Sequence, residues 1–292
     1  MLGYDFGVDH PSVSHTEVDS PNLETDLARG LRTGEFTLHY QPICSSRSGC
    51  VVGIEALLRW SSARSGPVPP SIFIPVAERT GLIHDLGRWV LDAACDQLVK
   101  WDREGLVFPF VSVNVSPEQL KNPAFASYVN EAITRSQVEA TRVELEITEG
   151  LRIHDTGRIK TIFETLRSQG IRMVVDDFGV GYSSLTYLQV LPLSKLKIDQ
   201  TFVVNLPSSR NDAAIVKALV GLARSLDLEL VAEGVEFEAQ REILTELGCE
   251  YIQGWLTCKP MPAEDLRQRF AEGTLRMVEQ AESRISSPLK TA

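Results

Sequence analysis

The chain has 292 residues, of which 43 % are hydrophobic and 23 % charged, so wholesale disorder is excluded and a large core can form. Its 29 Lys and Arg against 39 Asp and Glu give a net charge of −10, which argues against a non-specific binder of duplex nucleic acid. No run approaches about 18 consecutive apolar residues, so we expect no transmembrane segment.

The N-terminal segment and the cysteines favour a cytoplasmic location. Residues 1–20 are polar, lack helical or strand periodicity and contain no apolar stretch of the kind a secretory signal needs, so we expect a flexible tail. The cysteines are scattered and form no Cys-x-x-Cys pair, which argues against both a zinc site and a disulfide framework. We therefore expect reduced thiols and a protein of the cytoplasm.

Predicted strands and helices alternate along most of the chain. The first helix begins near residue 21, because Leu23, Leu27 and Leu31 recur at helical spacing. Short apolar runs then predict eight strands, over residues 36–43, 51–58, 108–115, 143–148, 171–176, 195–198, 228–232 and 251–253. Helical patterns are predicted over residues 83–101, 117–136, 155–169, 212–226, 236–247 and from 263 past 270.

This order of elements predicts an α/β fold. Strands that alternate with helices form parallel βα units, and mostly apolar strands are covered on both faces. Only residues 44–50 separate the first two strands, which is too short for a helical crossover, so these two should be antiparallel. We predict a modified TIM (β/α)8 barrel with an antiparallel first strand over residues 21–275, followed by a helical or frayed tail over residues 276–292.

Polar side chains recur within or at the end of seven successive predicted strands. Since the carboxyl ends of barrel strands meet at one face, where active sites are built, these side chains should converge. They are Glu55, Asn114, Glu146, Asp176, Asp177, Lys197, Glu233 and Gln253.

Five of these side chains are carboxylates, which would repel one another around a single mouth unless cations lay between them. Lys197 supplies one positive charge, and divalent metal ions are the obvious source of the rest of the positive charge. Carboxylate and amide oxygens suit Mg²⁺ or Mn²⁺. Adjacent Asp176 and Asp177 could let one carboxylate bridge two ions, the arrangement that enzymes use for in-line displacement at phosphorus. Arg59, with the metals, would admit an anionic phosphodiester.

The motifs that contain these residues resemble those of the EAL phosphodiesterases. The resemblance spans about residues 23–270, and its strength lies in eight ordered motifs on the expected strands. These are Tyr40-Gln41-Pro42-Ile43, Glu55-Ala56-Leu57, Asn114-Val115-Ser116, Glu146-Ile147-Thr148-Glu149, Asp176-Asp177-Phe178-Gly179, Leu196-Lys197-Ile198-Asp199, Ala232-Glu233-Gly234-Val235 and Gln253-Gly254-Trp255.

The resemblance implies hydrolysis of the bacterial second messenger cyclic di-GMP to linear pGpG with a two-metal site. Lys197 would position or deprotonate the attacking water, with Glu233 beside it as the base. The implied metal ligands are Glu55, Asn114, Glu146, Asp176 and Asp177, of which the last two would reach the second ion. The implied substrate-lining residues are Gln41, Leu58, Arg59 and Gln253, while Glu149 would anchor the loop over residues 177–185 and Glu236 would lie behind the ligands. A homodimer through residues 178–185 is also implied.

Two other functions remain open from the sequence. One is a receptor for cyclic di-GMP, or a protein-interaction module, with weak catalysis. The other is an unrelated barrel enzyme that acts on another phosphodiester. The intact set of expected metal ligands favours the phosphodiesterase over the receptor.

Several of these residues could instead have a purely structural role. Ser116 is expected to cap the helix that follows it. Lys197 could be a surface lysine like Lys195, which lies two residues earlier on the same face of the strand. Glu233 and Glu236 could be acids that favour the start of a helix through its dipole.

Overall fold

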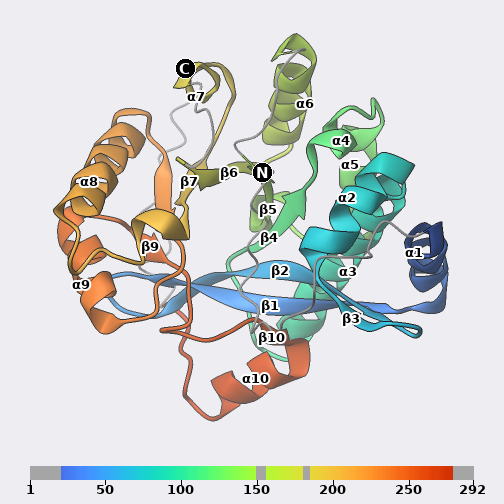
Figure 1. Ribbon diagram of the computed structural model, residues 1–292, viewed down its shortest axis with the longest axis horizontal. Coiled ribbons are helices and arrows are strands. Elements are labelled where there is room, and N and C mark those ends of the chain that lie inside the picture. Colours follow the sequence, from blue (N-terminus) through green and yellow to red (C-terminus); the bar gives the residue numbers. More distant parts are fainter. Residues whose placement is uncertain (1–20, 149–155, 180–184, 279–292) are drawn as a thin grey trace.

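Strands and helices alternate in the computed structural model, which describes residues 21–148, 156–179 and 185–278 (Figure 1). The strands are β1 (Phe36–Ser45), β2 (Val51–Ser62), β3 (Gly66–Val68), β4 (Val111–Val115), β5 (Val143–Thr148), β6 (Arg172–Phe178), β7 (Lys195–Ile198), β8 (Glu229–Ala232), β9 (Tyr251–Ile252) and β10 (Met261–Pro262). The helices are α1 (Pro21–Thr33), α2 (Pro70–Thr80), α3 (Ile83–Arg103), α4 (Pro117–Leu120), α5 (Phe125–Ser136), α6 (Thr156–Ser168), α7 (Leu185–Val190), α8 (Arg210–Ser225), α9 (Glu238–Leu247) and α10 (Ala263–Ala271).

Within the described residues, eight strands close into a barrel in the order β1-β9-β8-β7-β6-β5-β4-β2, and β2 returns to pair with β1. The first strand is antiparallel to both of its neighbours, β2 and β9, whereas the other pairings around the ring are parallel. The predicted α/β barrel with an antiparallel first strand is therefore confirmed. The short strands β3 and β10 pair with β2 and β1 outside the ring.

Alternation along the strands separates an apolar shell from a polar barrel interior. In β5, Leu145 and Ile147 belong to the large apolar cluster that also includes Phe163 of α6. The intervening residues Glu144 and Glu146 are equally buried but lie on the other face of the strand. Two carboxylates therefore lie inside the barrel, one layer above the other.

Proline accounts for two differences between the predicted and observed elements. The helix predicted over residues 117–136 is two helices, α4 and α5, because Pro123 lies between them and cannot donate a backbone hydrogen bond. The side chain of Asn122 accepts a bond from the backbone of Ala124 and starts the second helix. Strand β4 begins at Val111 rather than at residue 108, since Pro109 interrupts the ladder there.

The capping role predicted for Ser116 is confirmed. Its hydroxyl accepts a hydrogen bond from the backbone N–H of Glu118, and the Gln119 side chain accepts one from the backbone N–H of Ser116. This capping box separates β4, which ends at Val115, from α4, which begins at Pro117. It thereby fixes the carboxyl end of the strand that carries Asn114.

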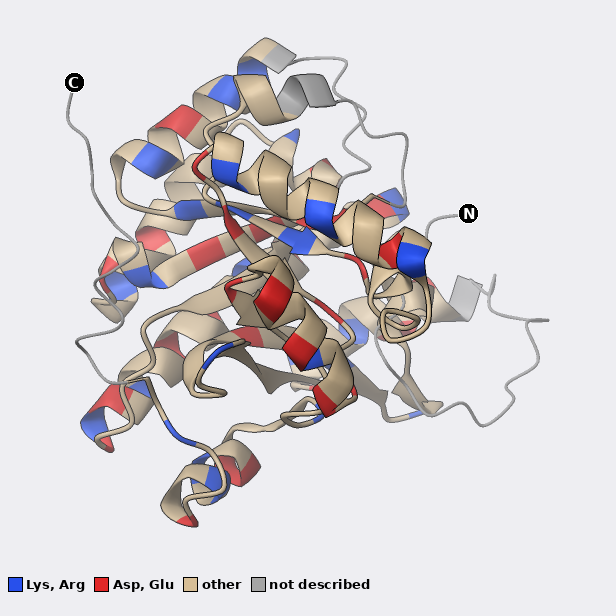
Figure 2. Cartoon of the chain, turned by 90° about the vertical axis from the view of Figure 1, so that its left-hand side faces the viewer, with Lys and Arg blue, Asp and Glu red and all other residues tan. Residues whose placement is uncertain are grey.

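The chain beyond α10 returns to the barrel. Met277 forms a parallel bridge with Val51, whose backbone N–H donates to the carbonyl of Arg276 at 2.7 Å. The helical or frayed tail expected from residue 276 is therefore wrong for residues 276–278, and its remainder lies outside the described residues, as does the predicted tail over residues 1–20. None of the described helices is long and apolar enough to cross a membrane. Charges of both signs are spread over the outer helices (Figure 2).

Replacing Gly53 with alanine is expected to destabilise the barrel by about 1–3 kcal/mol, the usual cost of overpacking a core. A Cβ there would lie 2.3 Å from Cζ of Phe110, and the face of that ring covers the buried ammonium of Lys195 at 3.8 Å. Gly221→Ala on the exposed face of α8 is the matched control, since its Cβ would meet nothing within 4 Å and should be neutral or stabilising. Thermal unfolding of both variants checks this; equal midpoints would contradict it.

Candidate active site

Lys197 of β7 lies at the centre of the converging carboxylates. Its ammonium is 2.6 Å from Glu233, 2.8 Å from Glu146, 3.1 Å from Glu55 and 3.4 Å from Asp176. The lysine is only 1 % exposed, so its interpretation as a surface residue is wrong. One cation thus faces four carboxylates contributed by four different strands or strand ends.

Three side chains hold the carboxylate of Glu55 in place by donating hydrogen bonds to it. Asn114 donates to its Oε1 at 2.6 Å, while Lys197 and Gln253 donate to its Oε2 at 3.1 and 2.7 Å. Burial alone would raise the pKa of Glu55, but the charge of Lys197 and the bonds from Gln253 and Asn114 hold the pKa below its ordinary value. Glu55 is therefore a preorganised carboxylate.

A chain of amides links Glu55 to the backbone. Gln253 donates through its Nε2 to Oε1 of Gln41 at 3.2 Å as well as to Glu55, and Gln41 donates in turn to the carbonyl of Cys258 at 3.2 Å. These bonds fix which way both amides point. The Oε1 atom of Gln253 is buried and has no hydrogen-bond partner among the described residues, so it can accept a bond from a ligand or water.

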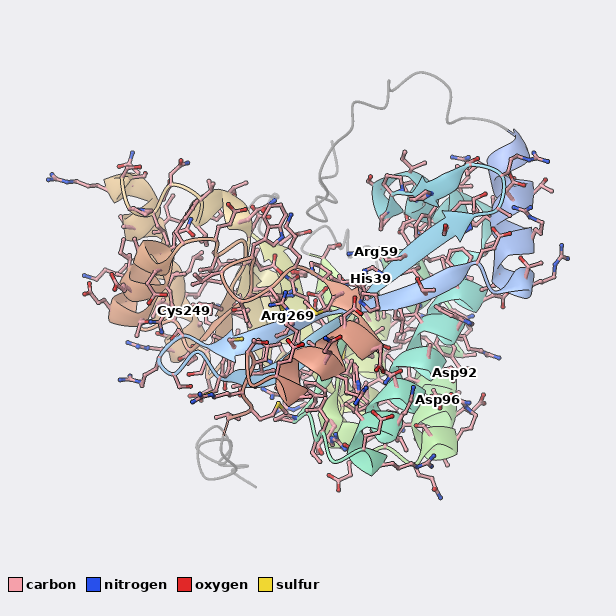
Figure 3. The ribbon with its side chains drawn as sticks, turned by 90° about the horizontal axis from the view of Figure 1, so that it is seen from below. His39, Arg59, Asp92, Asp96, Cys249 and Arg269 are labelled. Atoms are coloured by element: carbon pink, nitrogen blue, oxygen red, sulfur yellow. The ribbon has the colours of Figure 1, made fainter. Side chains whose placement is uncertain are left out.

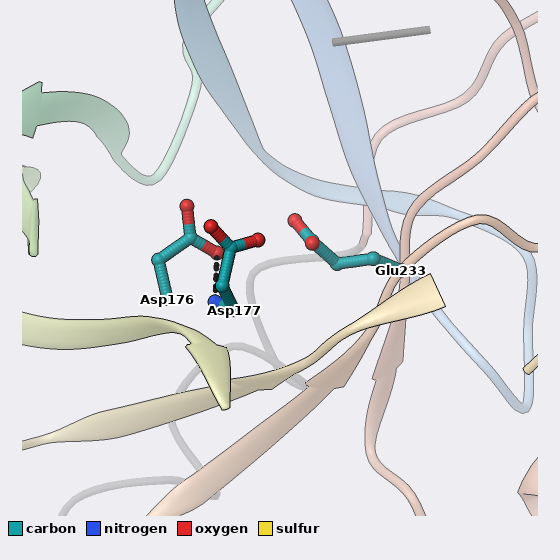
Figure 4. Close-up of side chains that lie close together, drawn as sticks. All are labelled: Asp176, Asp177 and Glu233. Atoms are coloured by element: carbon teal, nitrogen blue, oxygen red, sulfur yellow. Dashed lines mark hydrogen bonds between the residues drawn. The ribbon is translucent and has the colours of Figure 1, made fainter. Parts of the chain in front are cut away.

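Asp176, Asp177 and Glu233 form a group of carboxylates suited to a metal ion, since one oxygen from each lies within 4.8 Å of the others (Figure 4). Asp177 has a left-handed backbone with φ of 54°, and its N–H donates to Oδ1 of Asp176 at 3.0 Å. This turn at the end of β6 presents two successive carboxylates to the same space. The donor set of carboxylate and amide oxygens fits Mg²⁺ or Mn²⁺.

Lys197 and the five carboxylates near it form what we call the acidic layer, which consists of Glu55, Glu146, Asp176, Asp177, Glu233 and Lys197. This layer carries more negative charge than one lysine can balance. Burial, together with repulsion between neighbouring acids, raises the pKa of Glu146 and of Glu233 well above the usual range. The surrounding carboxylates outweigh burial at Lys197 and raise its pKa. Five ionised carboxylates and one ammonium would leave a charge of −4, counted from Glu55, Glu146, Asp176, Asp177, Glu233 and Lys197. Two divalent cations would neutralise that charge.

Asp177→Asn is expected to stabilise the metal-free protein. Burial and the neighbouring Asp176 raise the pKa of Asp177 from 3.8 to about 7. Because the folded-state pKa lies above the unfolded value of 3.8, ionisation of Asp177 opposes folding. The folding free energy that is present below the unfolded pKa is therefore lost as pH rises through about 7. The variant should therefore gain more stability at pH 8 than at pH 5, by a midpoint shift of roughly a few degrees. Thermal unfolding in a chelator tests this, and an equal gain at both pH values would contradict it.

A cavity of about 390 Å³ opens over the acidic layer. All four residues predicted to line the substrate, Gln41, Leu58, Arg59 and Gln253, line this cavity, and so does exposed Glu236. The sequence did not predict the apolar wall that α2 and α3 contribute, which consists of Pro70, Ile74, Ile83, Leu86 and Val90. Trp255, which follows the Gln253-Gly254 pair in the last motif, also lines the cavity and was not predicted to do so.

Arg59 places a cation at the cavity wall. Its guanidinium donates to the carbonyl of Leu58 at 2.9 Å, and burial lowers its pKa without approaching a range in which arginine loses its proton. His39 of β1 lies near it (Figure 3), and burial followed by the charge of Arg59 lowers the pKa of the imidazole. At neutral pH, His39 is therefore uncharged and Arg59 carries the positive charge on this wall.

A second ionic layer lies one step deeper in the barrel. In β5, Glu144 lies two positions before Glu146, and in β7, Lys195 lies two positions before Lys197. Glu144 contacts Lys195 at 2.8 Å and Arg172 at 3.1 Å, and accepts a hydrogen bond from Ser112. Glu229 is 2.6 Å from Arg172. This lower layer has two acids and two bases, so it is electrically balanced, in contrast to the layer above. The comparison with a surface lysine fails for Lys195 as well, which is 1 % exposed.

Two predictions from the sequence, the loop anchor and the loop itself, concern residues outside the described part of the chain. Glu149, the expected anchor of the loop over residues 177–185, lies outside the described residues, and so do residues 180–184 of that loop. The described part of the loop contributes Asp177 to the acidic group and Phe178 to the apolar cluster.

Comparisons with known proteins identify the family. Residues 24–260 match the EAL domain. The chain is 45 % identical over 241 residues to the bifunctional diguanylate cyclase/cyclic di-GMP phosphodiesterase MucR of Pseudomonas aeruginosa, covering 82 % of this chain and 35 % of that protein. The chain thus spans about a third of the length of such curated relatives.

Solved structures agree with this match. A PaMucR phosphodiesterase in complex with c-di-GMP superposes with a TM-score of 0.79 at 44 % identity, covering 84 % of this chain and 99 % of that one. The EAL domain of Mycobacterium smegmatis DcpA gives a TM-score of 0.70 at 34 % identity, covering 82 % of this chain and 97 % of that one. The chain therefore belongs to the EAL domain family.

Proposed function

We propose that this protein is a metal-dependent phosphodiesterase that hydrolyses cyclic di-GMP to linear pGpG. The observation that carries the proposal is the acidic layer, in which Lys197 contacts four carboxylates. Four of its five acids, Glu55, Asp176, Asp177 and Glu233, line the cavity, and the layer has a charge of −4 when fully ionised. Membership of the EAL family and similarity to a solved phosphodiesterase bound to c-di-GMP support the choice of substrate.

The residues present fit a pair of Mg²⁺ or Mn²⁺ ions. The proposed ligands are Glu55, Asn114, Glu146, Asp176 and Asp177. Held by these residues, the ions would supply Lewis acidity toward the phosphodiester and toward the attacking water. Balanced ion pairs need no metal, and the contrast with the neutral layer around Glu144 supports placing the ions in the upper layer.

The side chains of this site have distinct proposed roles. Lys197 is buried, positively charged and central, so it stabilises negative charge that develops on the reacting phosphate and orients the attacking water. Glu233, whose pKa is raised by burial, takes up the proton that the water releases. Arg59 binds the second phosphate of the substrate from the cavity wall. The proposed lining of the substrate is completed by Gln41, Leu58 and Gln253, and Glu236 is proposed as a residue that supports the ligands rather than a ligand itself.

Three further expectations from the sequence belong to this proposal. A homodimer would form through residues 178–185, with Glu149 as the anchor of that loop. The catalytic barrel would span residues 21–275. A cytoplasmic location is supported by free thiols, since Cys44, Cys95, Cys249 and Cys258 are all buried without a disulfide.

Product analysis tests the proposed reaction. The purified chain is incubated with cyclic di-GMP and Mg²⁺ or Mn²⁺, and the nucleotides are separated by chromatography. We expect a linear dinucleotide that carries one terminal phosphate. Intact cyclic di-GMP that remains bound to the protein would instead identify a receptor and contradict the phosphodiesterase.

A further inference from the structure

Trp255 is an exposed aromatic side chain at the wall of the cavity. The residue is 37 % exposed and lines the same space as the acidic layer. The ammonium of Lys259 lies 4.0 Å from the ring centroid and covers one face of the indole. Because Trp255 lines the cavity, its aromatic ring is available to stack on a flat group of a ligand.

The backbone holds Trp255 in a fixed position. Val235 donates to the carbonyl of Gln253 at 3.1 Å and accepts from the N–H of Leu256 at 2.9 Å, so both sides of Trp255 are tied to one residue. Gly254 permits this close approach, because a Cβ there would lie 2.2 Å from the carbonyl oxygen of Val235. A ring on such a clamped turn loses little freedom when it contacts a ligand.

The proposed substrate supplies a suitable partner. Cyclic di-GMP presents two guanine bases, and its phosphates belong over the acidic floor, where cations would hold them. The bases must then lie against the walls of the cavity. Every base offers a flat face for stacking on an aromatic ring. The ammonium of Lys259 lies against one face of the indole, so it does not occupy the opposite face, on which a base can stack.

We propose that Trp255, backed by Lys259, is the platform on which one guanine of cyclic di-GMP stacks. The inference rests on the proposed function and adds the residue that recognises the base. Trp255 acts in binding rather than in the chemical step, because it lies on the wall and contributes no group to the acidic layer.

The test separates binding from hydrolysis. Affinity for cyclic di-GMP is measured by calorimetry with Ca²⁺ as the metal, and kcat and KM are measured with Mg²⁺ or Mn²⁺. Trp255→Ala should weaken binding roughly 5- to 150-fold, the range found for loss of one stacked base, while kcat at saturating substrate stays within about twofold. Trp255→Phe keeps an aromatic ring and should restore most of the affinity.

Two controls make the result specific. Phe237→Ala removes another exposed aromatic ring, which is 61 % exposed and does not line the cavity, and should bind as the wild type does. Quenching of tryptophan fluorescence by cyclic di-GMP should be lost in Trp255→Phe while binding persists. An affinity of Trp255→Ala within twofold of wild type would overturn the proposal. Weakened binding by Trp255→Ala in a protein that hydrolyses nothing would support the platform and contradict only the phosphodiesterase.

Discussion

Lys197→Met is expected to lower kcat for cyclic di-GMP at least about 100-fold, the scale on which loss of one preorganised electrostatic group acts. The variant removes the ammonium that contacts Glu55, Glu146, Asp176 and Glu233. Those acids lose their common partner, so metal-free stability should fall by about 3–5 kcal/mol. Divalent metal should recover much of the stability, because it supplies positive charge at the same place, but should not recover the rate.

Lys195→Met is the matched control for this prediction. Lys195 lies on the same strand, is equally buried and contacts Glu144, so the substitution also breaks a buried ion pair. It should lower stability without metal rescue, while kcat per folded molecule stays within about tenfold. The two variants are compared by steady-state kinetics and thermal unfolding, with and without Mg²⁺. An equal loss of kcat in both would show that Lys197 acts only through folding.

Glu55→Gln is expected to reduce hydrolysis by about 1,000-fold or more, since the amide keeps the shape of the side chain but removes the charge that a divalent cation needs. Hydrogen bonds to Asn114 and Gln253 place this carboxylate in a fixed position, so neighbouring residues cannot substitute for it. Its removal also reduces repulsion with Glu146. The lowered pKa of Glu55 means that its charge stabilises the fold, so metal-free stability should fall as well as the apparent affinity for Mn²⁺.

Glu144→Gln is the matched control, because it should lower stability without changing metal binding. Glu144 is fully buried in the balanced layer, where it pairs with Lys195 and Arg172. Its neutralisation leaves Lys195 and Arg172 to share Glu229 as their remaining acid, so stability should fall by about 3–5 kcal/mol. Metal affinity, measured by calorimetry, should remain that of the wild type. Near-normal turnover by Glu55→Gln at saturating metal would show that the assignment of Glu55 as a ligand is wrong.

The convergence of the site residues could be predicted because it depends on strand ends. Glu146 and Lys197 sit in apolar runs whose bounds, 143–148 and 195–198, match β5 and β7. Once strands alternate with helices, the parallel ring brings the carboxyl ends of those strands together. The hairpin of β1 and β2 followed in the same way from the short segment between them.

Other features depend on contacts between distant segments and could not be read from local patterns. Burial of Lys195 follows from the closure of the barrel, which brings Glu144 within 2.8 Å from two strands away. Part of the apolar wall of the cavity comes from α2, whose Pro69-Pro70 start and internal Pro75 obscure a helical pattern. Trp255 reaches the cavity because its turn is bound to Val235, a contact that sequence spacing does not reveal.

The decisive measurement is the dependence of hydrolysis on divalent metal, because it shows whether the acidic layer is a metal site. Protein stripped with a chelator is titrated with Mg²⁺ or Mn²⁺, and the initial rate of cyclic di-GMP loss is followed at each concentration. The acidic layer around Lys197 predicts no detectable rate without metal and a rate that rises to saturation as metal is added. Hydrolysis that proceeds equally well in excess chelator, or that never begins at any metal concentration, would contradict the account.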